Sequence, residues 1–88
     1  LSGLAIDERH RGRGYGRRLL LRAIAEYRAR DYIWLYGQFD ESARLAHFYK
    51  SMGFTVLAPG HPLHGPKRLG SIKFAANSPT EQWFSLEL

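Results

Sequence analysis

The chain has 88 residues, of which 44% are hydrophobic, 14% aromatic and 24% charged. This composition is typical of one small folded domain and excludes a disordered or low-complexity chain. The net charge is +5, and the absence of cysteine excludes a disulfide framework, a thiolate metal site and a cysteine nucleophile. The absence of cysteine fits a reducing compartment, so we expect a cytoplasmic protein. No apolar run approaches the roughly 20 residues of a membrane span, so we expect no membrane partner.

Arginines are concentrated near the start of the chain. Those between residues 9 and 30 are Arg9, Arg11, Arg13, Arg17, Arg18, Arg22, Arg28 and Arg30. Because the planar guanidinium group binds phosphate through a fork of donors, this cluster indicates an anionic partner, such as a nucleotide, a nucleic acid or an acidic surface. The alternative is that the arginines form the solvated face of a helix.

The first third of the chain predicts a strand, a helix and a second strand. Residues 1–6 read as a short strand, and residues 17–30 carry Leu20, Ile24 and Tyr27 at helical spacing. Residues 32–36 form a continuous apolar and aromatic run, as expected for a strand covered on both faces by packed helices. This order predicts a βαβ unit with a parallel pair of strands.

The middle of the chain predicts a connection, a second helix and a third strand. Residues 37–40 read as the connection, with Asp40 as the N-cap of a helix over residues 41–52. Gly53 is placed to end this helix in the left-handed conformation. Residues 54–57 then read as the third strand.

The last third is mainly loop. Residues 58–70 are rich in proline and glycine, residues 71–75 form a short candidate strand, and residues 82–88 alternate as a final strand antiparallel to the third. The fold class is therefore α/β (α+β), in the order strand, helix, strand, helix, strand, long loop, strand, with a mixed sheet. His61 and His64 have the spacing of a metal pair but lack a third ligand, so we expect no metal.

The strongest local motif is the glycine-rich segment from Arg11 to Gly16, between the first strand and the first helix. Three glycines allow a tight turn, and the free amides of the following helix favour a pyrophosphate. A dinucleotide-binding loop would need glycine or alanine at Arg17, and a triphosphate-binding loop would need a Gly-Lys-Ser/Thr sequence that is absent. The pattern that remains is Arg-x-x-Gly-x-Gly.

This segment resembles the coenzyme A pyrophosphate loop of the GNAT (general-control-type) N-acetyltransferases. A second motif supports the resemblance, because residues 47–54 place Phe48-Tyr49 on a helix that ends in Gly53-Phe54. The resemblance covers roughly residues 1–57, and the two motifs are separated by one helix and one strand, as in that family. It implies a partial acyl-CoA N-acyltransferase fold.

The resemblance implies transfer of an acetyl group from acetyl-CoA, the co-substrate, to a primary amine by direct attack. Tyr49 would be the general acid that protonates the leaving thiolate, and the backbone amide of Ile6 would polarise the carbonyl. The implied coenzyme A-binding residues are Leu4, Ala5, Ile6, Arg11, Gly12, Arg13, Gly14, Tyr15, Gly16, Arg17 and Ser42.

Two departures from the family pattern stand out. Ser42 occupies the position, seven residues before Tyr49, where the family commonly has an asparagine that touches the pantetheine, and Gln38 and Asp40 are alternatives for that polar role. The chain also starts at the central strand, so we expect residues 1–88 to be a single partial domain that lacks the N-terminal part of the fold. A longer protein, a second copy or a partner subunit would then complete the exposed sheet edge.

Two other functions compete with acetyl transfer. The chain could be a degenerate half-domain that serves as a coenzyme A-binding or dimerisation module. It could also be a nucleic-acid-binding module built on the arginines. The aromatic residues needed for base stacking mostly lie in core patterns, however, so we expect no nucleic-acid partner.

Overall fold

The computed structural model describes the backbone of residues 5–7 and the whole of residues 16–88. Its elements, in chain order, are β1 (Ala5–Asp7), α1 (Arg17–Ala29), β2 (Trp34–Asp40), α2 (Ala43–Ser51), β3 (Thr55–Val56), β4 (Leu63–His64), a 3-10 turn (Lys67–Leu69), β5 (Lys73–Phe74) and β6 (Glu81–Glu87). The fold is α+β with a mixed sheet, which confirms the predicted class.

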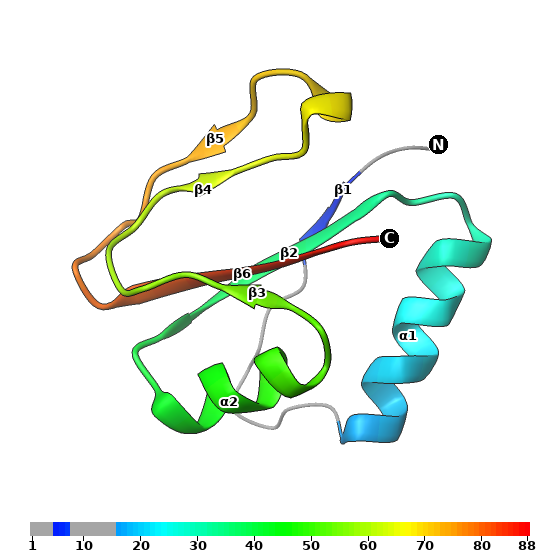
Figure 1. Ribbon diagram of the computed structural model, residues 1–88, viewed down its shortest axis with the longest axis horizontal. Coiled ribbons are helices and arrows are strands. Elements are labelled where there is room, and N and C mark those ends of the chain that lie inside the picture. The colour runs from blue at the N-terminus through cyan, green and yellow to red at the C-terminus, as the bar shows by residue number, and fades with distance from the viewer. Residues whose placement is uncertain (1–4, 8–15) are drawn as a thin grey trace.

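The main sheet has the strand order β1-β2-β6-β3 (Figure 1). β1 is parallel to β2, with Ala5 opposite Trp34, and this confirms the predicted βαβ unit. β6 is antiparallel to β3, as predicted, and it is also antiparallel to β2 along the whole length of that strand. The last strand of the chain therefore lies between two strands that the second helix connects.

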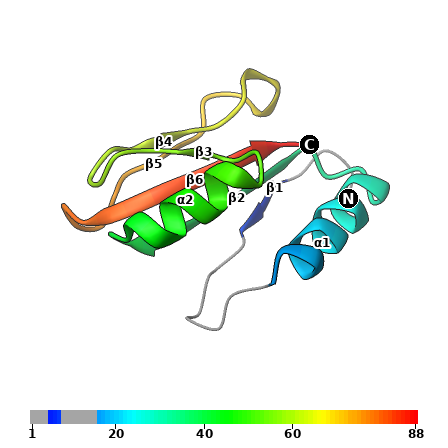
Figure 2. The same ribbon diagram turned by 60° about the horizontal axis from the view of Figure 1, so that its bottom comes forward.

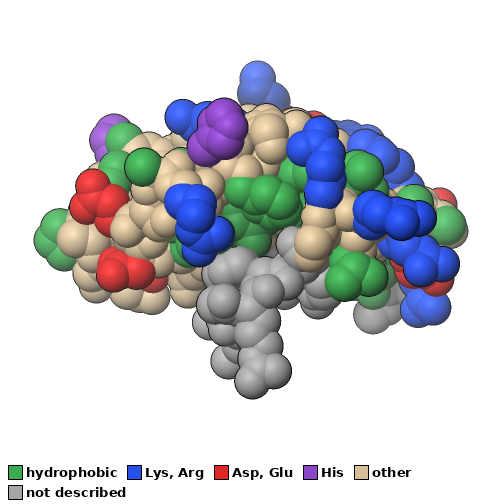
Figure 3. Space-filling model, turned by 90° about the horizontal axis from the view of Figure 1, so that it is seen from below, with side chains coloured by type: hydrophobic (Ala, Val, Ile, Leu, Met, Phe, Trp, Pro, Cys, Tyr) green, Lys and Arg blue, Asp and Glu red, His purple; other side chains and the backbone are tan. Residues whose placement is uncertain are grey.

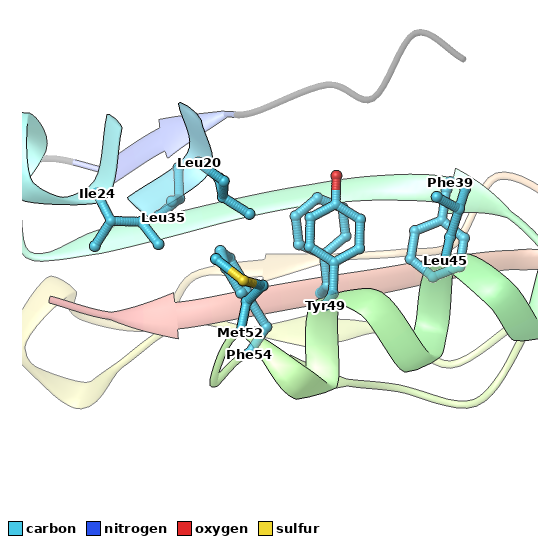
Figure 4. Close-up of a cluster of buried hydrophobic side chains, with 9 residues drawn as sticks. Leu20, Ile24, Leu35, Phe39, Leu45, Tyr49, Met52 and Phe54 are labelled. Atoms are coloured by element: carbon cyan, nitrogen blue, oxygen red, sulfur yellow. The ribbon is translucent and has the colours of Figure 1, made fainter. Parts of the chain in front are cut away.

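Both helices pack on the same face of this sheet (Figure 2). Along β2, Leu35 and Phe39 face the helices, and on β6 Phe84 does so. They form one hydrophobic core with residues of both helices and of the chain after α2: Leu20, Ile24, Leu45, Tyr49, Met52 and Phe54 (Figure 4). The predicted apolar stripe of α1 is therefore confirmed.

A hairpin formed by β4 and β5 covers the opposite face of the sheet. It buries Trp34 and Trp83 beneath Leu63, and Phe74 stacks on Tyr36 with 5.1 Å between ring centroids. The expectation that the second strand is covered on both faces is confirmed. The expected cover was helical on both faces, and the structure replaces one helical layer with this aromatic hairpin.

Several predicted boundaries are wrong. Residues 37–40 are not a connection, because β2 continues through them in register with residues 81–84 of β6. The second helix begins at Ala43 rather than at residue 41, and its N-cap is Ser42 rather than Asp40. The predicted loop over residues 58–70 contains β4 and the 3-10 turn.

Other local predictions are confirmed. Gly53 follows α2 with a φ of 94°, a conformation that favours glycine. The short strand expected within residues 71–75 is β5, and Leu86 and Leu88 lie on the core face together with Phe84, as the alternation of the last strand predicts.

Replacing the core residue Phe84 tests this packing. Phe84 is 0% exposed and stacks directly on Tyr49, so Phe84→Ala should lower the free energy of unfolding by about 3–5 kcal/mol through lost burial and an unfilled cavity. Urea denaturation followed by circular dichroism measures this change.

The matched control is Leu21→Ala on α1, because Leu21 is 50% exposed. This change should alter the free energy of unfolding by no more than about 0.5 kcal/mol. Similar losses in the two variants would contradict the position of Phe84 in the core.

Candidate functional site

Tyr49 is held by aromatic rings on several sides. Its side chain is 2% exposed, and its ring stacks on Phe84 with centroids 3.9 Å apart and planes inclined by 16°. Phe39 stacks from β2 at 5.8 Å, and Phe48 and Phe54 make edge contacts. Figure 4 shows the ring rising from α2, with its hydroxyl oxygen pointing away from the helix. The ring is therefore fixed, and its hydroxyl group is presented at a defined place.

The edge of β2 beside this ring extends beyond β1. The pairing of β1 with β2 is described as far as Asp7 opposite Tyr36, whereas β2 continues to Asp40. Among the described strands, only β6 pairs with this last part of β2. Phe39, which stacks on Tyr49, lies within it. An extended ligand could therefore hydrogen-bond to the β2 backbone next to the tyrosine.

The N-terminus of α1 is suited to an anion. Its N-cap is Gly16, which offers no side-chain cap, and the first turn contains no acidic residue. Amides of this turn that have no intrahelical acceptor carry the positive end of the helix dipole, and the exposed Arg17 and Arg18 add charge beside them. Figure 3 shows basic side chains gathered over α1.

The ion pair that the described residues form near these arginines lies far from the start of α1. Across residues 16–88 this ion pair joins Arg30, the C-cap of α1, to Glu26 at 3.2 Å, at the end of the helix far from Gly16. Among residues 16–88 no acidic side chain pairs with Arg17 or Arg18, and such a charge suits a phosphate group.

Arg17 connects this basic helix end to the tyrosine-bearing helix. Its Nη1 donates to the Oγ of Ser51 over 3.5 Å, and that Oγ donates in turn to the carbonyl oxygen of Phe48 at 2.7 Å. Because Ser51 is the last residue of α2, this contact brings the anion-suited end of α1 close to the helix that carries Tyr49.

The predicted binding residues divide into those the structure places and those outside its described part. Ala5 and Ile6 lie in β1, in register with Trp34 and Leu35 of β2. Gly16 and Arg17 begin α1. The residues outside the described ranges are Leu4, Arg11, Gly12, Arg13, Gly14 and Tyr15, together with His10 and Glu8.

Ser42 is the N-cap of α2, the role that was predicted for Asp40. Its Oγ accepts a hydrogen bond from the backbone N–H of Leu45 at 3.1 Å, as an N-cap residue does. A serine hydroxyl that accepts this bond can still donate its own hydrogen. Ser42 can therefore cap α2 and offer a donor at the same time.

The two polar alternatives to Ser42 are already bound to other groups. By strand alternation, Gln38 and Asp40 lie on the face of β2 opposite α2. The Oδ1 of Asp40 accepts from the Oγ1 of Thr80 at 2.6 Å. With its amide oriented to satisfy its neighbours, Gln38 donates to the carboxylate of Glu81 at 2.6 and 2.8 Å.

Sequence reasoning missed Gln82 as a structural partner of α2. This side chain is 7% exposed, and its Oε1 accepts from the backbone N–H of Ser42 at 3.2 Å. The sequence did contain a signal for this role. Residues 82, 84, 86 and 88 share one face of the last strand, and Gln82 is the only polar residue among these four, so its amide needs hydrogen-bond partners there.

The histidines of residues 16–88 form no metal site. His47, His61 and His64 are all exposed. Within the described ranges, no group of three His, Cys, Asp or Glu side chains is arranged to hold a metal ion. In the same part of the chain, neither helix is long and apolar enough to cross a membrane.

A comparison with protein-family models identifies the family of this chain. The profile of the acetyltransferase (GNAT) domain matches residues 1–56, which run from the first strand through β3. The protein belongs to this family of acetyltransferases. The matched part holds the glycine-rich segment and Tyr49, whereas the hairpin and β6 lie beyond it. No curated protein and no solved structure gave a significant match.

The capping role of Ser42 can be measured through stability. Ser42→Ala should lower the free energy of unfolding by about 1 kcal/mol, because the N–H of Leu45 loses its acceptor. Ser42→Asn is the matched control, since asparagine caps helices as well as serine does, and it should remain within a few tenths of a kcal/mol of the parent. Thermal and urea denaturation provide both values. An unchanged stability of Ser42→Ala would contradict the assignment.

Proposed function

We propose that the protein transfers an acetyl group from acetyl-CoA to a primary amine, with Tyr49 as the general acid. The family match supports an acetyltransferase. The observation that carries the finer proposal is the fixed position of Tyr49, whose ring is stacked on Phe84 beside the part of β2 that extends beyond β1.

The start of α1 and the preceding glycine-rich segment would bind the pyrophosphate of coenzyme A. Backbone amides near Gly14 and Gly16 would donate to the phosphate oxygens, and Arg11, Arg13 and Arg17 would add charge-assisted hydrogen bonds. The basic first turn of α1 fits this role, because it holds no acidic residue and its N-cap, Gly16, has no side chain to cap the helix.

The pantetheine arm would lie between the ends of β1 and β2. Leu4, Ala5 and Ile6 would offer backbone groups on one side, and the β2 edge from residue 37 onward lies on the other. The hydroxyl group of Ser42, at the start of α2, could donate to an amide oxygen of this arm. The thioester would then come close to Tyr49.

The reaction would proceed by direct attack. The amine nitrogen forms a bond to the thioester carbon, and the N–H of Ile6 stabilises the resulting oxyanion. When the C–S bond breaks, Tyr49 gives its hydroxyl proton to the thiolate sulfur. The proton lost by the amine passes to water. No covalent enzyme intermediate is formed, in keeping with a chain that has no cysteine.

We also propose that residues 1–88 form a single partial domain of this type and act in the cytoplasm. β1 is an edge strand of the described sheet, and the unpaired side of such a strand can accept another one. A further segment of the protein or a second copy would pair there and complete the acceptor groove.

The variant Tyr49→Phe tests the proposed role of Tyr49. The change keeps the ring and its stacking on Phe84 but removes the acidic proton, so kcat should fall about 10²- to 10⁴-fold. The KM for acetyl-CoA should change little. Release of free coenzyme A thiol, measured with a panel of primary amines, gives both constants.

Full activity of Tyr49→Phe would contradict the role of this residue as general acid. Saturable binding of acetyl-CoA without thiol release for any amine would instead favour the binding or dimerisation module.

A further inference from the structure

Gln82 is an unusual residue for its position. It is the only polar side chain that is buried in the described part of the chain, and it lies on the core face of β6 in the same row as Phe84. Burying an amide is costly unless its polar atoms are hydrogen-bonded. Two hydrogen bonds of the Gln82 amide offset the cost of its burial.

The two ends of the amide bind different elements. The Oε1 accepts from the backbone N–H of Ser42 at 3.2 Å, and the Nε2 donates to the backbone carbonyl of Leu57 at 3.0 Å. Ser42 is the N-cap of α2, and Leu57 follows directly after β3. Gln82 thus ties β6 to the start of α2 and to the end of β3.

These bonds act on the helix that carries Tyr49. The first turn of α2 follows Ser42, and Tyr49 lies about two turns further along the same helix. The cross-strand partner of Gln82 is Phe39, whose ring stacks on that of Tyr49. A shift of the helix start relative to β6 would therefore move the tyrosine hydroxyl.

We infer that Gln82 is a positioning residue for acetyl transfer, which fixes α2 against β6 and so sets the place of the Tyr49 hydroxyl. This inference rests on the proposed role of Tyr49 as general acid. Gln82 itself touches neither the thioester nor the amine.

The variant Gln82→Met separates positioning from folding. Methionine has a similar length and suits a core, and it removes both hydrogen bonds. The stacking of Tyr49 on Phe84 does not involve Gln82, so the sheet should still form. We expect kcat to fall about 10- to 100-fold, because small misplacements of a catalytic group are costly. The KM for acetyl-CoA should stay within about twofold of the parent.

Thr80→Val is the matched control. It removes the hydrogen bond from the Thr80 hydroxyl to Asp40 at the same end of the sheet, and the Asp40 side chain lies on the face of β2 opposite α2. Its kcat should remain within about twofold of the parent value. The inference would be overturned if Gln82→Met kept the kcat of the parent. It would also be overturned if Thr80→Val lost as much kcat as Gln82→Met.

Hydrogen exchange of the Ser42 amide provides a readout that does not depend on activity. In Gln82→Met this amide should exchange at least about tenfold faster, because its acceptor is gone, while core amides of α1 keep their protection. Unchanged exchange at Ser42 would overturn the inference. If Tyr49→Phe keeps full activity, the proposed function fails, and the exchange rate still decides whether Gln82 fixes α2.

Discussion

The pairing of β2 with β6 is the interaction on which the rest of the structure depends. The two strands run antiparallel from Trp34 opposite Glu87 to Asp40 opposite Glu81. This register places Phe39 and Phe84 on the face that receives both helices, and Trp34 and Trp83 on the face that receives the hairpin. A slip of one residue would exchange the two faces and separate Tyr49 from its stacking partner.

The same pairing explains how a small chain can hold a reactive hydroxyl group in place. Tyr49 contributes its ring to the core, so close packing fixes the position of the ring. Gln82 of β6 accepts a hydrogen bond at the start of α2, the helix that carries Tyr49. At the end of the same helix, Ser51 accepts a hydrogen bond from Arg17 at the basic start of α1. The candidate anion site and the candidate acid are thus connected through elements that pack on one sheet.

Much of this arrangement could be predicted from the sequence, because it rests on local patterns. The spacing of Leu20 and Ile24 predicts α1, and Gly53 marks the end of α2. The extent of β2 could not be predicted, because Gly37 and Asp40 resemble turn residues until β6 pairs with them. The N-cap of α2 was wrongly assigned to Asp40 for a similar reason. The carboxylate of Asp40 binds the hydroxyl of Thr80, which lies far along the chain. Gln82 depends likewise on partners distant in sequence, and such contacts leave little local signal.

The measurement that tests the central claim most directly is a calorimetric titration of the protein with acetyl-CoA, compared with Gly14→Glu. In the predicted loop an added carboxylate would fill the space of the pyrophosphate and repel it, so saturable binding should be lost. Ser71→Glu adds the same charge at an exposed position away from α1 and should bind normally. Equal binding by the parent and by Gly14→Glu, or no binding by the folded parent, would contradict the account.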